Sequence, residues 1–167
     1  MKTAYYKYLD INMVKGELPP ELEAHAITKQ SKAAWALLSN CWRNVYGEDL
    51  PTVEFLKSGK PIINGGYISI AHSNNMVAVA FSKDAVVGVD IELIKNDYPK
   101  RVAELMNYNG EPCGFYSLWT RREAVIKAFD LSSLKRGAEG QFTGYTAVVD
   151  GGYALAVYGE DASFIKL

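Results

Sequence analysis

Two acidic residues interrupt a stretch that otherwise has the composition of a buried strand. Residues 86–93 read VVGVDIEL, and because side chains alternate across a strand, Asp90 and Glu92 should share one face. Two carboxylates at this spacing repel each other unless a cation lies between them, and burial would otherwise favour their protonation. The spacing therefore indicates either a metal site or an acidic face that is solvated or paired with Lys or Arg.

A second set of charged residues lies on a segment with helical periodicity. Residues 115–129 carry apolar side chains at helical spacing, which predicts a helix. Trp119, Glu123 and Lys127 follow one another at i, i+4 and i+8, so they form a row along that helix. This row can bring a third carboxylate and an ammonium to the cleft that holds the first two acids. The alternative is an ordinary surface pair of Glu123 with Lys127.

Two further residues upstream suit the binding of an anion. Lys60 lies in the turn Gly59-Lys60-Pro61, and His72 ends a predicted strand that begins at Tyr67. The alternative for His72 is a strand-end histidine that is satisfied by ordinary hydrogen bonds. Singly, each of these residues is better explained by its structural role, and only their combination indicates chemistry.

The order of four motifs resembles that of a known enzyme family. These are G-K-P at 59–61, I-A-H-S at 70–73, G-V-D-I-E at 88–92 and W-T-R-R-E-A-V-I-K at 119–127. The same order is found in the 4′-phosphopantetheinyl transferase superfamily, and more closely in its larger, Sfp-type branch, in which one chain holds two similar halves. The resemblance implies transfer of the phosphopantetheine arm of coenzyme A to a serine hydroxyl of an apo carrier protein. It also implies release of 3′,5′-ADP and a requirement for Mg²⁺.

The resemblance assigns roles to individual residues. It implies a catalytic set that consists of Asp90, Glu92, Glu123 and Lys127. The three carboxylates of that set would hold Mg²⁺, which prefers oxygen ligands and usually binds through a few carboxylates, water and substrate phosphates.

Three basic side chains would bind coenzyme A, which is the co-substrate. Lys60 and His72 match family positions that hold its phosphates, and Lys29 is a looser match near the 3′-phosphate. A histidine beside a phosphate would have a raised pKa. Glu123 is the candidate acceptor for the serine proton, with a metal-bound water as the alternative.

Two departures from the family pattern keep other functions open. Ala71 stands where family members commonly have serine, which predicts the loss of one hydroxyl contact to phosphate, and Lys127 is followed by Ala-Phe-Asp-Leu instead of glycines. One alternative is a catalytically impaired relative that binds coenzyme A or a carrier protein. The other is a Mg²⁺-dependent nucleotide phosphodiesterase with water as its nucleophile.

The pattern of helices and strands that must position these residues indicates an α+β fold with antiparallel sheets. A strand is expected at 3–9, a helix from Glu21 whose apolar stripe ends before Gly47, and a short helix at 99–106. Strands at 67–71, 76–81 and 86–93 should form a meander, and Asp150-Gly151-Gly152 should turn a hairpin of strands at 145–149 and 153–158. We expect one domain over 1–167, a pseudo-dimer of two similar halves at about 1–95 and 96–167 with the coenzyme A cleft between them.

Composition bounds the partners and the compartment. The 167 residues carry a net charge of −1, which argues against a broad nucleic-acid surface, and no stretch suggests a membrane span or a signal peptide. We therefore expect a cytoplasmic monomer with an apo acyl or peptidyl carrier protein as partner, in fatty acid, polyketide or nonribosomal peptide biosynthesis. Cys41 and Cys113 form no metal or disulfide pattern. A cluster of basic residues could guide an acidic carrier helix, with a solvated face as the alternative: Lys95, Lys100, Arg101, Arg121 and Arg122.

Overall fold

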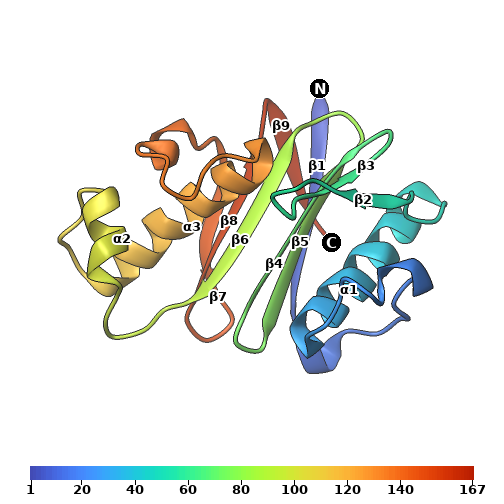
Figure 1. Cartoon of the computed structure of the whole chain (residues 1–167), viewed down its shortest axis with the longest axis horizontal. Helices are drawn as coiled ribbons and strands as arrows, with labels where there is room; N and C mark the ends of the chain where they lie inside the picture. The colour runs from blue at the N-terminus through green and yellow to red at the C-terminus, as the bar shows by residue number, and fades with distance from the viewer.

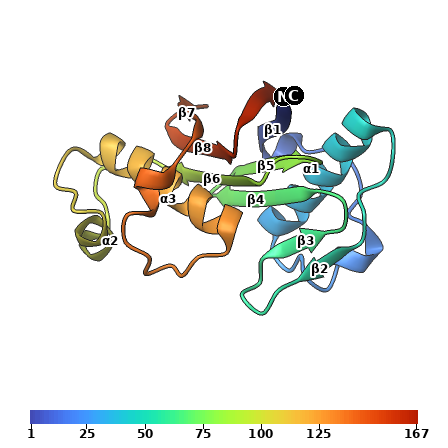
Figure 2. The same cartoon turned by 90° about the horizontal axis from the view of Figure 1, so that it is seen from above.

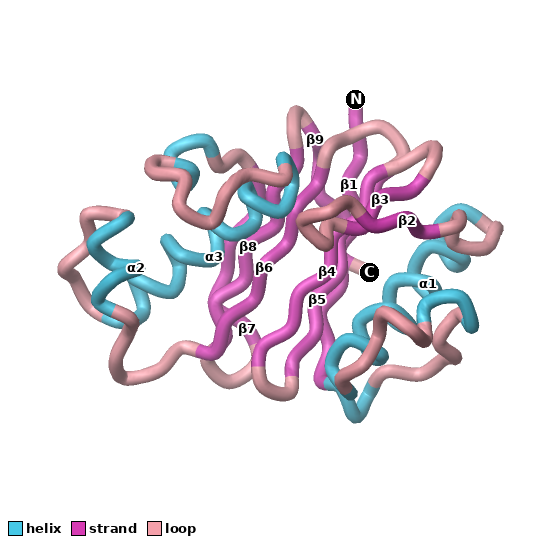
Figure 3. Tube along the Cα trace, viewed as in Figure 1, coloured by secondary structure: helices cyan, strands magenta, loops and turns pink.

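Two β-sheets pack between two long helices. The computed structural model describes all residues, 1–167. Helix α1 (Lys29–Tyr46) and helix α3 (Pro112–Phe129) lie on opposite sides, and most of the strands run between them (Figure 1). The tube coloured by secondary structure shows the same division, with strands in the centre and helices at the flanks (Figure 3). The α+β fold with antiparallel sheets is thereby confirmed.

One of the two sheets consists mainly of strands from the first half of the chain and is called the front sheet. It contains both the first strand of the chain and the last. Its order is β4 (Tyr67–Ser73), β5 (Met76–Ser82), β1 (Lys2–Asp10) and β9 (Ala162–Lys166). The first three strands pair antiparallel, whereas β9 lies parallel to β1. The view from above shows β9 returning from the back elements to lie beside β1 (Figure 2). The predicted first strand and the β4–β5 hairpin are confirmed.

The other sheet, called the back sheet, consists mainly of strands from the second half of the chain. It contains the strand with the two carboxylates. Its order is β6 (Val87–Leu93), β8 (Tyr153–Gly159) and β7 (Gly144–Val149), and all pairs are antiparallel. The hairpin of β7 and β8 is confirmed. The predicted three-strand meander is wrong in its third strand, because β6 pairs with β8 and not with β5. A period-2 pattern identifies a strand but does not identify its partner.

The main core lies between the two sheets. The inner face of the front sheet contributes small residues such as Ala4, Ala78 and Ala80, and β6 contributes Val89 and Ile91. Small side chains on one sheet and branched ones on the other allow close packing of the two layers. As alternation predicts, the inner residues of β6 leave its acidic residues on the opposite face.

Each helix covers the outer face of one sheet. Helix α1 packs Trp35 and Trp42 against the outer face of β5, and α3 packs Ala124 and Ala128 against β8. Helix α1 begins at Lys29, where the side chain of Thr28 accepts a hydrogen bond from the Ser31 backbone N–H. The helix expected from Glu21 therefore starts later than predicted. Its end at Gly47, which has a left-handed backbone (φ 71°), is confirmed.

The order of elements repeats once along the chain. A strand, a long helix and a hairpin occur as β1, α1, β4–β5 and again as β6, α3, β7–β8. In both sets the second strand of the hairpin pairs with the first strand of the set, which gives the orders β4-β5-β1 and β7-β8-β6. Hydrogen bonding thus groups β6 with the elements that follow it, whereas the sequence pattern grouped it with those before it.

Shorter elements complete the fold. Strands β2 (Val53–Phe55) and β3 (Pro61–Ile63) form a separate hairpin that contains Lys60 in its turn, and α2 (Lys100–Leu105) is the predicted short helix. Cys41 and Cys113 are both free thiols. None of the helices is both long and apolar enough to cross a membrane.

Candidate functional site

A close contact between β6 and α3 brings the sequence motifs together. Gly88 lies on the same face of β6 as Asp90 and Glu92, and a Cβ atom at Gly88 would lie 1.9 Å from the carbonyl oxygen of Ala124 in α3. Only glycine permits this approach of the helix backbone to the strand. As a consequence, Lys127 on α3 reaches across to the carboxylates of the strand.

Asp90 is the most deeply buried acid of the chain. It is 4% exposed, and its Oδ1 accepts a hydrogen bond from Lys127 Nζ at 2.6 Å. Its Oδ2 is buried and has no hydrogen-bond partner. Burial, opposed by Lys127 and assisted by the charge of Glu123, raises the pKa of Asp90 to about 6. One oxygen of this carboxylate is therefore still available to a ligand.

Glu92 lies two residues after Asp90 on the same face of β6, and its carboxylate accepts a hydrogen bond from a serine. The Ser73 hydroxyl donates to Glu92 Oε2 at 3.2 Å and accepts a hydrogen bond from the Leu93 backbone N–H at 3.0 Å. Burial, followed by repulsion from Asp90, raises the pKa of Glu92 to about 7. The two carboxylates of β6 thus destabilise each other, as their spacing predicted.

Glu123 is turned toward its neighbour on the helix. Its Oε1 accepts a hydrogen bond from the Arg122 guanidinium at 2.6 Å, although its charge still acts on both Asp90 and Glu92. No group of three His, Cys, Asp or Glu side chains is arranged as a metal cluster. The predicted role of Glu123 as a third metal ligand stays a prediction.

The donor set nonetheless fits a hard divalent cation. The carboxylates of Asp90 and Glu92 offer only oxygen, they repel each other, and one buried oxygen of Asp90 is unpartnered. These are the properties of an oxygen site for Mg²⁺, in which the ion relieves the repulsion. In this structure the ammonium of Lys127 supplies the compensating positive charge.

A cleft of about 720 Å³ opens next to Lys127, and both sets of repeated elements line it. Trp35, Phe55 and Lys60 come from the part of the chain before β6, and Lys127 and Ser132 come from the part after it. Polar and aromatic side chains are mixed along its wall, which suits a ligand with both a charged group and a flat ring. The predicted cleft between the two parts of the chain therefore has the size of a small-molecule site.

Lys60 connects the front hairpin to the end of α3. Its Nζ donates a hydrogen bond to the carbonyl oxygen of Ala128, in the last turn of the helix. Desolvation lowers the pKa of Lys60, partly offset by the charge of Asp130. An ammonium has three donors, so two remain for a ligand in the cleft.

The two other predicted basic ligands lie outside the residues that line this cleft. His72 is exposed beside Lys127, and partial desolvation and the charge of that lysine lower its pKa. A raised pKa, as expected beside a phosphate, would therefore need a bound anion. Lys29 is exposed and donates a hydrogen bond to Asn12 Oδ1 at 3.1 Å.

The structure corrects two of the sequence interpretations. Ala71 is 4% exposed and packs in the core between the sheets. A side chain at this position therefore does not reach a phosphate in the cleft, and the predicted loss of a hydroxyl contact does not apply. Arg122 is 2% exposed and cannot belong to an exposed basic patch. Arg121 is partly buried, whereas Lys95, Lys100 and Arg101 are exposed.

Three side chains of the site were missed from the sequence. His25 lines the cleft and stacks on Phe55 with ring centroids 4.0 Å apart, but no motif marks it. Alternation puts Ser73 on the same face of β4 as Ser69 and Ala71, but it does not identify β6 as the neighbouring strand, so the contact of Ser73 with Glu92 has no signal in the sequence. The role of Arg122 has no signal in the sequence other than its place beside Glu123.

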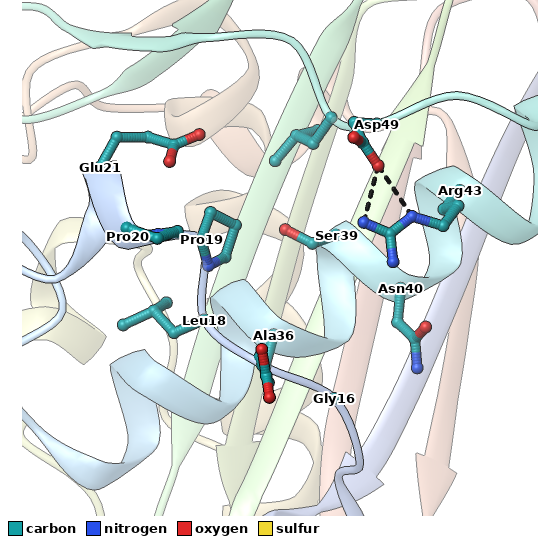
Figure 4. A pocket seen from close by; sticks show the side chains of 12 residues that line it. Gly16, Leu18, Pro19, Pro20, Glu21, Ala36, Ser39, Asn40, Arg43 and Asp49 are labelled. Atoms are coloured by element: carbon teal, nitrogen blue, oxygen red, sulfur yellow. Dashed lines mark hydrogen bonds and ion pairs between the residues drawn. The ribbon is translucent and has the colours of Figure 1, made fainter.

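A second cavity is unrelated to this chemistry. It has a volume of about 410 Å³ and lies between the segment from Gly16 to Glu21 and helix α1 (Figure 4). Its one arginine, Arg43, is paired with Asp49 at 2.6 Å. None of the predicted site residues lines it.

Comparison with known proteins gives two relatives and no family model that matches. The chain is 29% identical over 132 residues to 4′-phosphopantetheinyl transferase AcpT of Salmonella typhi, and equally to AcpT of Salmonella typhimurium. The match covers 67% of this chain and spans 66% of the length of each relative. The chain is thus similar in sequence to 4′-phosphopantetheinyl transferases, in agreement with the order of its four motifs.

Proposed function

We propose that the protein transfers the 4′-phosphopantetheine arm of coenzyme A to a serine hydroxyl of an apo acyl or peptidyl carrier protein. In this reaction the serine oxygen forms a bond to phosphorus, the diphosphate bond of coenzyme A breaks, and 3′,5′-ADP leaves. The reaction would depend on Mg²⁺, as in holo-acyl-carrier-protein synthases. The relatives carry the name of this transferase, and the chain spans about two thirds of their length.

One observation carries the proposal. Lys127 lies between a cleft of small-molecule size and two carboxylates, the partly buried Glu92 and the buried Asp90, which has an unpartnered oxygen. Phosphoryl-type transfer depends mainly on positioning and on neutralising charge at the phosphate oxygens. Lys127 supplies positive charge at the wall of the cleft, and the carboxylates behind it supply oxygen ligands for a cation that would add more.

Residues of the chain have separate tasks in this proposal. Lys60, in the wall of the cleft, would bind a phosphate of coenzyme A with its two remaining donors, and His72 and Lys29 would assist from outside it. Lys127 would leave Asp90 and bind an oxygen of the diphosphate. Glu123 would accept the proton of the incoming serine on Oε2, because Arg122 engages Oε1.

The metal would be held by Asp90 and Glu92, with Glu123 as the proposed third ligand. When bound, Mg²⁺ supplies positive charge that stabilises the diphosphate oxygens. The chain's own contribution is to hold the two carboxylates side by side, and the hydroxyl that Ser73 donates to Glu92 favours the charged form of that carboxylate.

The carrier protein would dock beside Glu92. A cavity of about 330 Å³ is lined by Glu92, Lys95, Tyr98 and Trp119, and α2 begins just beyond it with Lys100 and Arg101. Exposed basic side chains next to the proposed catalytic carboxylates favour an acidic partner surface. An acidic carrier helix laid along this segment would bring its serine close to Glu92.

Intact-mass measurement of a panel of apo carrier proteins, incubated with the protein, coenzyme A and Mg²⁺, tests the proposal. We expect one carrier to gain the mass of one phosphopantetheine, and Asp90→Asn to abolish the gain. Formation of 3′,5′-ADP without any carrier would instead identify a phosphodiesterase. No mass gain on any carrier, with coenzyme A bound, would identify a binding protein.

A further inference from the structure

Arg122 is a buried cation that the proposed reaction does not use. It is 2% exposed, and it lies next to Glu123 on α3. Burial of a guanidinium costs several kcal/mol unless its charge and its N–H groups are satisfied. Its Nε has no hydrogen-bond partner, so the groups that pair with the two Nη atoms show what the side chain is there to hold.

The guanidinium contacts two parts of the molecule at once. Its Nη1 donates to Glu123 Oε1 at 2.6 Å, and its Nη2 donates to the backbone carbonyls of Ser133 and Lys135. No other carboxylate pairs with it. A single planar side chain thus joins a carboxylate of the site to the loop 131–137.

That loop is part of the cleft wall. Leu131, Ser132 and Ser133 line the cleft together with Lys60 and Lys127. The side chains of residues 132–137 are exposed, so few packing contacts hold the loop in place. Its backbone contacts with Arg122 are therefore a main source of its order.

We propose that Arg122 is a positioning residue that couples the cleft-wall loop 131–137 to the carboxylate of Glu123. The guanidinium fork is rigid, so a change in the loop moves the donor that orients Glu123, and loss of the Glu123 charge loosens the hold on the loop. The role given to Glu123 rests on the proposed function, whereas the coupling itself concerns only the fold.

The first test needs no substrate. Amide hydrogen exchange is measured for residues 131–137 in the wild-type protein, in Glu123→Gln and in Arg122→Lys. We expect exchange in the loop to become about tenfold faster in both variants, since each removes part of the link. Unchanged loop exchange in Glu123→Gln would overturn the coupling, because the Glu123 side chain bonds to Arg122 and has no hydrogen bond to the loop. This result is available even if Arg122→Lys fails to fold.

The second test separates positioning from simple stability. Arg43→Lys is the control, because Arg43 is an exposed arginine on α1 that pairs with Asp49 and does not line the cleft. Well below the melting temperature, we expect Arg122→Lys to lower kcat about tenfold or more, with a smaller change in KM for coenzyme A, and Arg43→Lys to leave both unchanged. A folded Arg122→Lys with wild-type kcat would overturn the inference. Faster loop exchange in a protein that modifies no carrier would contradict the proposed function alone.

Discussion

Glu92→Gln should stabilise the protein at alkaline pH and leave its stability nearly unchanged at acidic pH. The pKa of Glu92 rises from 4.5 to about 7 on folding, because the carboxylate is buried beside Asp90. The folded state therefore binds the proton more tightly than the unfolded state, so this group costs stability as the pH rises. The cost begins near the unfolded pKa and is complete above the folded one.

The magnitude follows from the size of the shift. A difference of about 2.5 pKa units corresponds to about 3 kcal/mol of unfolding free energy. Glutamine has the same shape, its side-chain oxygen can still accept the Ser73 hydroxyl, and it carries no charge. We therefore expect Glu92→Gln to be more stable than the wild type by about 2–3 kcal/mol near pH 8, and by much less near pH 5.

Urea unfolding at the two pH values, with a chelator present to exclude divalent ions, measures this difference. The matched control is Glu104→Gln, because Glu104 is exposed on α2 and forms no ion pair. Addition of Mg²⁺ near pH 8 should then stabilise the wild type more than Glu92→Gln. An equal effect of Glu92→Gln on stability at both pH values would refute the explanation that burial and repulsion by Asp90 raise the pKa of Glu92.

Three further changes test the elements around the site. Gly88→Ala should destabilise the protein by about 1–3 kcal/mol or more and separate α3 from β6, because the new Cβ meets the Ala124 carbonyl. The control is Gly140→Ala, whose Cβ meets no atom within 4 Å. Equal melting temperatures for the two variants would contradict the close contact. Ser69→Ala should cost about 1–3 kcal/mol in chemical denaturation, because the buried Val89 N–H loses its acceptor at 3.0 Å; no loss would mean that another group replaces the hydroxyl. Lys60→Ala should mainly raise the KM for coenzyme A in the transfer assay, and an unchanged KM would exclude Lys60 from binding it.

Local sequence patterns predicted the elements and one face of the site. Alternation in residues 86–93 placed Asp90 and Glu92 together, and helical spacing placed Lys127 on a helix that could reach them, as it does. These features depend on the periods of strand and helix alone.

Features that depend on contacts between distant segments could not be read in this way. The partner of β6 is decided by how the two sheets pack, and the pattern of the strand is compatible with either neighbour. Arg122 is charged and was assigned to the surface, but the loop 131–137 folds over it and supplies carbonyl acceptors. The orientation of Glu123 follows from that burial, and no spacing rule contains it.

The parallel pairing of β9 with β1 has a mechanical consequence for the cleft. The strand that follows β8 crosses to the other sheet and is hydrogen-bonded there from Lys2↔Ala162 to Tyr6↔Lys166. It acts as a strap, because the two layers cannot swing apart as rigid bodies without peeling that ladder open. Access of a bulky ligand to the cleft should therefore depend on movement of surface loops, while the distance between the two layers stays fixed.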